Sequence, residues 1–165
     1  MKQLLTLLFV ACSFFLSDTY AQGSLSPKAV AKYGNVEVNY SRPSKRNRVI
    51  FGVLEPYGQV WRTGANEATE ITFKKDGLFG GKKVKAGTYT LFTIPGEKDW
   101  VVILNSKLGQ WGAFEYENVK DKDVVNVTVP SKKKAEVTEQ FTITVKADEL
   151  LLDWDQTLVA VPIKF

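Results

Sequence analysis

The sequence of 165 residues contains no histidine and a single cysteine, Cys12. Without histidine, Ser-His-Asp and Cys-His catalysis and nearly all ordinary zinc and copper sites are excluded. Cys12 lies in an N-terminal segment that we expect to be removed, so disulfides, thiolate metal ligands and cysteine nucleophiles are excluded as well. A metal site would need carboxylates and carbonyls. Because no Asp-rich loop of the calcium-binding kind is present, we predict no metal and no cofactor.

The N-terminus has the pattern of a secretory signal peptide. Lys2 supplies a positive charge, residues 4–16 are mostly apolar, and the tripeptide that ends at Ala21 places small residues at the minus-three and minus-one positions of a cleavage site. The apolar run is shorter than the about 20 residues that a membrane-spanning helix needs. We therefore predict that residues 1–21 are a signal peptide cleaved near Ala21.

A second interpretation of this segment is a lipoprotein signal that ends on an acylated Cys12. It would leave apolar residues at positions 14–16, directly after the lipid, where a polar tether is expected. We favour the cleaved signal, and we expect an exported protein, periplasmic or extracellular, whose mature chain has no transmembrane segment.

Positive charge is in excess, with a net charge of +4, and much of it is clustered. Residues 41–48 hold four basic side chains, and residues 132–134 are three lysines in a row. Such clusters serve either solubility or the binding of an anionic ligand or surface. Nucleic acid is disfavoured because the chain has a signal peptide and no recognisable nucleic-acid-binding module.

Short alternating segments with turn signals between them fill the rest of the chain, and no segment has a convincing helical period. After a polar lead-in at 22–31, read as a loose arm or an extra edge strand, we expect strands at residues 32–41, 49–51, 60–63, 69–75, 88–94, 100–104, 124–129, 136–146, 150–154 and 158–165, the last two as a hairpin. About ten short strands at near-regular spacing predict an all-β, single-domain antiparallel β-sandwich over residues 22–165, with a barrel-like form as the alternative.

The stretch from Tyr57 to Lys74 brings a tryptophan, an arginine, two glycines, an asparagine and a glutamate together around one expected turn. Trp61 and Arg62 are adjacent on an expected strand, so their side chains point to opposite faces. One interpretation is a rigid turn in which Trp61 fills the core, Asn66 caps the turn and Glu67 pairs with an arginine. The other is a site in which Arg62, Asn66 and Glu67 converge on a polar ligand beside an apolar wall formed by Trp61.

A second candidate is the basic segment that contains Arg42, Arg46 and Arg48. Arg42 precedes a proline, which holds it in an extended conformation. A fixed guanidinium of this kind suits a carboxylate or a phosphate. The alternative is an ion pair with a glutamate at position 55, 67 or 70.

The third candidate is Trp111, which is followed by a glycine in an expected loop. An exposed Trp there could stack on a sugar ring or hold a peptide, whereas a buried one would close one end of the sandwich. Paired carboxylates, Glu67 with Glu70 or Asp76, could serve as the two catalytic groups of a glycosidase. Their spacing in the sequence, however, is not specific for that role.

Several of these motifs together resemble a known family. They are Tyr40-Ser41-Arg42-Pro43, Arg48-Val49-Ile50-Phe51-Gly52, Pro56-Tyr57-Gly58, the heptapeptide V-W-R-T-G-A-N at 60–66, A-G-T-Y-T-L-F at 86–92 and Gln110-Trp111-Gly112-Ala113. The pattern is similar to that of the bacterial domain-of-unknown-function family numbered 2911, over nearly all of the mature chain. The resemblance implies an exported bacterial protein, and it brings no activity and no residue roles. One departure is Asn47, where the family pattern has glycine.

Taken together, these features favour a non-enzymatic protein that binds a small polar or anionic ligand, a glycan or a peptide. The candidate binding residues are Arg42, Arg46, Arg48, Trp61, Arg62, Asn66, Glu67 and Trp111. The alternatives are a carboxylate-based, glycosidase-like hydrolase and a purely structural or assembly module of the cell envelope.

Overall fold

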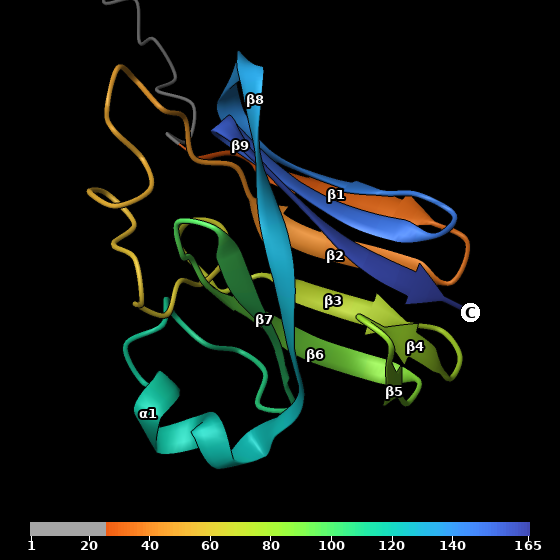
Figure 1. The fold of residues 1–165 in the computed structure, drawn as a ribbon. Coiled ribbons are helices and arrows are strands. Elements are labelled where there is room, and N and C mark those ends of the chain that lie inside the picture. Colours follow the sequence, from red (N-terminus) through yellow and green to blue (C-terminus); the bar gives the residue numbers. More distant parts are fainter. Residues whose placement is uncertain (1–25) are drawn as a thin grey trace, which may run out of the picture.

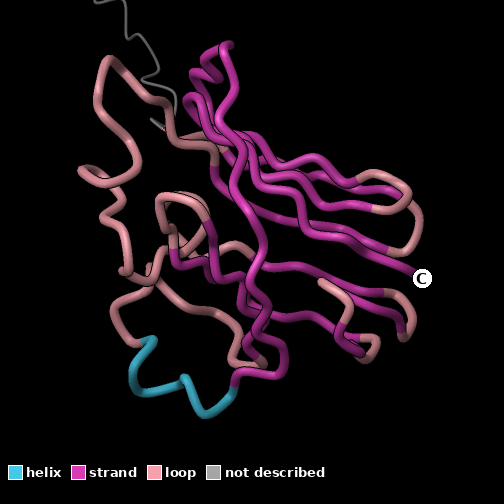
Figure 2. Tube along the Cα trace, viewed as in Figure 1, coloured by secondary structure: helices cyan, strands magenta, loops and turns pink. Residues whose placement is uncertain are grey.

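Nine strands and two short helical segments make up residues 26–165, the part of the chain that the computed structural model describes (Figures 1 and 2). The predicted signal peptide with Cys12 lies outside the described residues. The elements are β1 (Lys28–Tyr33), β2 (Val36–Ser41), β3 (Glu70–Phe73), β4 (Gly77–Phe79), β5 (Lys82–Val84), β6 (Gly87–Ile94), β7 (Asp99–Asn105), α1 (Tyr116–Val119), the 3-10 turn η1 (Lys120–Lys122), β8 (Asp123–Val145) and β9 (Glu149–Lys164).

All nine strands belong to one antiparallel sheet in the order β1-β2-β3-β6-β7-β8-β9-β4-β5. The prediction of an all-β antiparallel fold is confirmed. The sheet does not close, so the barrel-like form is not adopted, and β1 and β5 are its edges. Its two ends nevertheless face each other across the core. Tyr40 of β2 packs on Phe141 of β8, and Phe73 of β3 packs on Phe79 of β4, with ring centroids 5.8 Å apart in both pairs.

The sheet folds into two layers within β8, at Pro130 and Ser131. One layer holds β1, β2, β3, β6, β7 and the first part of β8, and the other holds the rest of β8 with β9, β4 and β5. Residues up to Pro130 pair with β7, and from Ser131 onward the strand pairs with β9. Pro130 has no N–H to donate, so it fits where one ladder ends and the next begins. Figure 1 shows β8 rising from the helical end of the molecule to the top of the view, where it bends and continues beside β9.

The core is built from the inward residues of the alternating strands. Val125, Val127 and Val129 of β8 are buried, whereas the residues between them are exposed. At the centre, an aromatic cluster brings together residues far apart in the sequence, namely Phe51, Trp61, Trp100, Phe141 and Trp154. This cluster holds the two layers together through burial of large apolar surfaces.

Several predicted strand boundaries were wrong. The expected strand at residues 32–41 is interrupted by a turn at Gly34, whose φ is +54°, and the lead-in at 22–31 contributes most of β1. The alternation changes phase across the turn, because Ala29 and Ala31 pack against the core in β1 whereas Val36, Val38 and Tyr40 are the buried residues of β2. The expected strand at 60–63 is reduced to a single bridge between Trp61 and Thr93.

The long strands β8 and β9 were each predicted as two. β9 continues through Asp155, which adopts a positive φ of 53° where the pairing with β8 is irregular. Such a bulge bends a strand without ending it, and the Asp-Gln pair had suggested a hairpin. The helical turns α1 and η1 were not predicted, because they span only four and three residues. Over residues 26–165, no helix has the length and apolar character needed to cross a membrane.

Candidate functional site

Trp61 is part of the core. Its side chain is 3% exposed, its ring stacks on Trp154 at 5.7 Å, and its indole N–H donates to the carbonyl of Gly64 at 3.1 Å. The indole is therefore enclosed by the aromatic cluster and does not form the wall of an open site.

The side chain of Arg62 reaches the Trp111 loop and does not join the aromatic cluster. Its guanidinium lies behind Gly112, since a side-chain carbon added at Gly112 would be 3.1 Å from Nη1. Nε of Arg62 is buried and makes no hydrogen bond within residues 26–165. Nearby, burial raises the pKa of Glu55 to about 7, although the positive charges of Arg62 and Arg48 act to lower it.

The loop that carries Trp111 is fixed against the segment that leads into β3. A bridge joins Glu67 to Trp111, with Ala68 N donating to Gln110 O at 2.9 Å and Gly112 N donating to Asn66 O at 3.1 Å. Asn66 adopts a φ of +60°, which asparagine tolerates better than most residues. Trp111 itself is 63% exposed, so its side chain is held at the surface by an ordered backbone.

Beside Trp111 lies an open groove of about 590 Å³. It is lined by residues 28–30 of β1, residues 39–41 of β2, residues 67, 68 and 70, and residues 109–111 of the Trp111 loop. At its rim, Lys28 and Glu67 form an exposed ion pair at 3.1 Å. The pKa of Glu67 is held below its usual range by its own backbone N–H and by Lys28. The groove therefore combines an aromatic surface with three charged groups, one lysine and two glutamates, of which Lys28 and Glu67 are paired.

Arg42, Arg46 and Arg48 are outside the lining of this groove. Arg42 binds β8, where its Nε donates to Phe141 O at 3.1 Å and its Nη2 donates to Thr142 Oγ1 at 2.7 Å. Its fixed guanidinium thus joins the end of β2 to the opposite layer.

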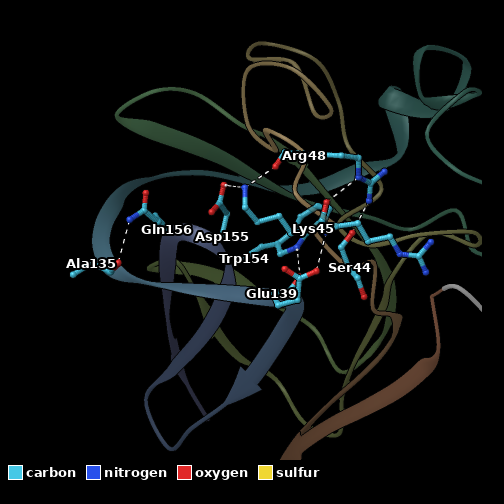
Figure 3. A network of polar contacts seen from close by, with 9 residues as sticks. Ser44, Lys45, Arg48, Ala135, Glu139, Trp154, Asp155 and Gln156 are labelled. Atoms are coloured by element: carbon cyan, nitrogen blue, oxygen red, sulfur yellow. Dashed lines mark hydrogen bonds and ion pairs between the residues drawn. The ribbon is translucent and has the colours of Figure 1, made fainter.

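The basic loop forms a network of its own with β8 and β9 (Figure 3). Arg48 donates to the carbonyls of Lys45 and Ser44, and the Lys45 ammonium lies between the Arg48 carbonyl, at 2.6 Å, and Asp155, at 2.9 Å. The backbone N–H of Arg46 donates to Glu139 Oε1 at 2.8 Å. These contacts hold the loop onto the bulged part of the β8–β9 pair.

The predicted site residues therefore fall into separate groups. Glu67 and Trp111 line the groove, and Arg62 and Asn66 lie behind the Trp111 loop. Trp61 is in the core, and the other three arginines are on the β8 side. The alternative that residues 22–31 contribute an extra edge strand is confirmed by β1, but the sequence did not show that β1 and β2 line a groove beside Trp111. Sequence reasoning also missed Glu55 as a half-buried carboxyl, since nothing in a loop sequence marks a residue as partly buried.

Two glutamates line the groove, and each is held by a hydrogen bond. Glu67 has a lowered pKa, and Glu70 accepts the backbone N–H of Gly109 at 3.1 Å. Glu55, whose pKa is raised, belongs to a different loop and does not line the groove. Within the described part of the chain, no cluster of three acidic residues that could hold a metal ion is found.

The fold and the groove define an all-β protein whose open, aromatic-walled groove lies at one edge of its sheet. The chain belongs to a family described as protein of unknown function (DUF2911), whose family model matches residues 26–163. This match confirms the resemblance seen in the sequence motifs. Neither the curated proteins nor the solved structures include a significant match to this chain.

Proposed function

We propose that this protein is an exported, non-enzymatic binding protein that holds an uncharged polar ligand of the glycan class in the groove beside Trp111. The observation that carries the proposal is an indole 63% exposed on a loop fixed by hydrogen bonds, at the wall of a groove of about 590 Å³. A groove with an apolar wall and a few placed polar groups is the usual form of a ligand site.

A sugar ring matches both parts of this groove. Its C–H face packs on an indole, and its hydroxyl groups exchange hydrogen bonds with amides and carboxylates. Asn39 and Gln110 supply amides, and Glu67 and Glu70 supply carboxylates. Because the Trp111 loop is already ordered, little conformational entropy would be lost on binding.

The charges favour an uncharged ligand over an anionic one. Lys28 is paired with Glu67 at the rim, so the groove carries no excess of positive charge there. The arginines that could hold an anion are outside the lining, and Arg42 and Arg48 already donate to the protein. An anionic ligand would therefore find no dedicated partner in this groove.

A peptide is the second candidate, and the position of β1 favours it. β1 is an edge of the sheet, so an extended peptide could add a strand along it while a side chain enters the groove. A hydrolase is less well supported, since the lowered pKa of Glu67 is opposite to what a general acid needs.

The test is a screen of the protein, purified after expression of the full chain, on a glycan array and a peptide array, followed by calorimetric titration of the ligands found. We expect Trp111→Ala to weaken glycan binding at least about tenfold, because aromatic anchors dominate binding energies. Phe114→Ala is the matched control, since Phe114 is 78% exposed and outside the groove lining. Binding of peptides alone would select the second candidate. The proposal fails if no glycan binds or if Trp111→Ala binds as the wild type does.

A further inference from the structure

We propose that the loop of residues 49–57 and the lysine-lined pocket beside it form a docking surface for a membrane that contains anionic phospholipids. This surface shares no lining residue with the groove beside Trp111, so the inference is independent of the function proposed above.

The loop exposes a cluster of large apolar side chains. Val49 is 60% exposed, Val53 68%, Leu54 36% and Tyr57 43%. Scattered single apolar residues at a surface are ordinary, but several on one short loop mark an interaction site with a protein or a membrane. Tyrosine in addition is enriched where proteins meet the membrane–water interface.

The loop is built to hold these side chains outward. Leu54 N donates to Val49 O at 3.3 Å, and Glu55 N donates to Ile50 O at 3.0 Å. Ile50 is fully buried, and the Phe51 ring packs on Trp100 with centroids 4.8 Å apart. The loop is thus anchored in the aromatic core by two residues while its other apolar residues face the solvent.

Positive charge adjoins the apolar loop. A pocket of about 390 Å³ is lined by Val49 and Tyr57 from the loop and by three lysines, Lys98, Lys132 and Lys133. Lysine ammonium groups bind phosphate as point charges, and three of them around one pocket suit an anionic headgroup. The pocket therefore places a phosphate site next to side chains that could enter the lipid boundary.

The acidic residues nearby do not cancel this charge. Asp155 lines the pocket but is paired with Lys45 at 2.9 Å. Glu55 of the loop is half-buried and does not line the pocket, and burial raises its pKa to about 7, so it is only partly ionised at neutral pH. Glu97 is the remaining acid of the lining, and the lysines outnumber it.

An anionic lipid surface fits this combination better than a protein partner. The apolar residues project from a loop and do not line a groove, which suits insertion into a fluid boundary. The adjacent lysines need only a field of negative charge and not a particular geometry. Each lysine near an anionic membrane strengthens binding about fivefold, and the effect weakens with salt.

The test is co-sedimentation of the protein, purified after expression of the full chain, with phosphatidylcholine vesicles and with vesicles that also contain phosphatidylglycerol. We expect binding to the mixed vesicles, weakened by salt, and much weaker binding to phosphatidylcholine alone. The double variants Val53→Ser/Leu54→Ser and Lys132→Glu/Lys133→Glu should each lose at least about tenfold in affinity. Both alter exposed side chains, and unchanged melting temperatures would show that the fold is kept.

The matched control is Lys74→Glu/Lys75→Glu, which changes the net charge equally at an exposed turn between β3 and β4. We expect this control to bind mixed vesicles nearly as the wild type does. If the control and the Lys132→Glu/Lys133→Glu variant lost the same affinity for mixed vesicles, binding would depend only on the net charge of the protein. That result would overturn the proposal. The proposal would also be overturned if the protein bound no vesicles. It would likewise be overturned if the wild type formed a dimer in sedimentation equilibrium and Val53→Ser/Leu54→Ser were a monomer, because the apolar loop would then be a dimer interface.

Discussion

Replacing Glu55 with glutamine should remove a pH dependence of stability that the wild-type protein carries between pH 4.5 and about 7. In the folded protein, burial raises the pKa of this carboxyl from 4.5 to about 7, against the opposing influence of Arg62 and Arg48. In the unfolded chain the carboxyl would titrate near its ordinary value. Between these two pH values the folded state therefore binds more protons than the unfolded state, and the free energy of unfolding falls as pH rises.

The difference between the two pKa values corresponds to about 3 kcal/mol of stability. This stability is fully present below pH 4.5 and is lost as pH rises through about 7. Glutamine stays neutral at every pH, so Glu55→Gln should keep its stability over this window. The variant should consequently become the more stable protein, relative to the wild type, as the pH is raised.

The assay is urea denaturation of both proteins across a pH range of about 5 to 8. The difference between their free energies of unfolding cancels the titration of groups common to both. The chain has no histidine, the side chain that ordinarily titrates in this window, so interference is small. A difference that stays constant with pH would show that Glu55 ionises at an ordinary pKa, and the reasoning from its burial would be refuted.

Three further substitutions test the packing of the two layers by urea denaturation. Trp61→Ala should lower the free energy of unfolding by about 3–5 kcal/mol, because it leaves a cavity at the centre of the aromatic cluster. A loss below about 1 kcal/mol, which is typical of a surface site, would contradict the position of Trp61 in the core. Tyr40→Phe should lower it by about 1–3 kcal/mol, since the hydroxyl accepts a buried N–H of β8 at 3.0 Å; no loss would mean that water satisfies that N–H. Gly80→Ala should lower it by about 1–3 kcal/mol, because φ is +56° and the new carbon would lie 2.6 Å from Val127. Gly81→Ala is the control, because Gly81 has a φ of +81° and a carbon added there would meet no neighbouring atom, so its free energy of unfolding should fall by only about 1 kcal/mol. Equal losses of stability at the two glycines would contradict the contact with Val127.

The sequence predicted the fold class because strand residues alternate between a buried and an exposed face. Val125, Val127 and Val129 show this pattern plainly, and all three are buried. The pattern could not show whether a strand ends or continues at a residue that is typical of turns. Pro130 and Asp155 read as turns, yet β8 and β9 pass through them, since the strands change partner or bulge there and do not end.

The candidate site was harder to predict, because neighbouring positions in a sheet come from distant parts of the chain. Trp111 and Glu67 do meet, through a bridge between segments that the sequence does not connect. Arg42 was expected near an anion or a glutamate, but its partners are a carbonyl and a hydroxyl of β8. The pairing of β1 with β2 completes the groove, and only the tertiary structure reveals it.

The central claim is that Trp111 forms the wall of a ligand site, and quenching of tryptophan fluorescence tests it most directly. Trp61, Trp100 and Trp154 are at most 3% exposed, whereas Trp111 is 63% exposed, so a collisional quencher such as acrylamide reaches chiefly Trp111. A glycan found on the array should protect this fluorescence at saturation, and Trp111→Phe should abolish both the quenching and the protection. A glycan that binds tightly while Trp111 remains fully open to the quencher would contradict the account.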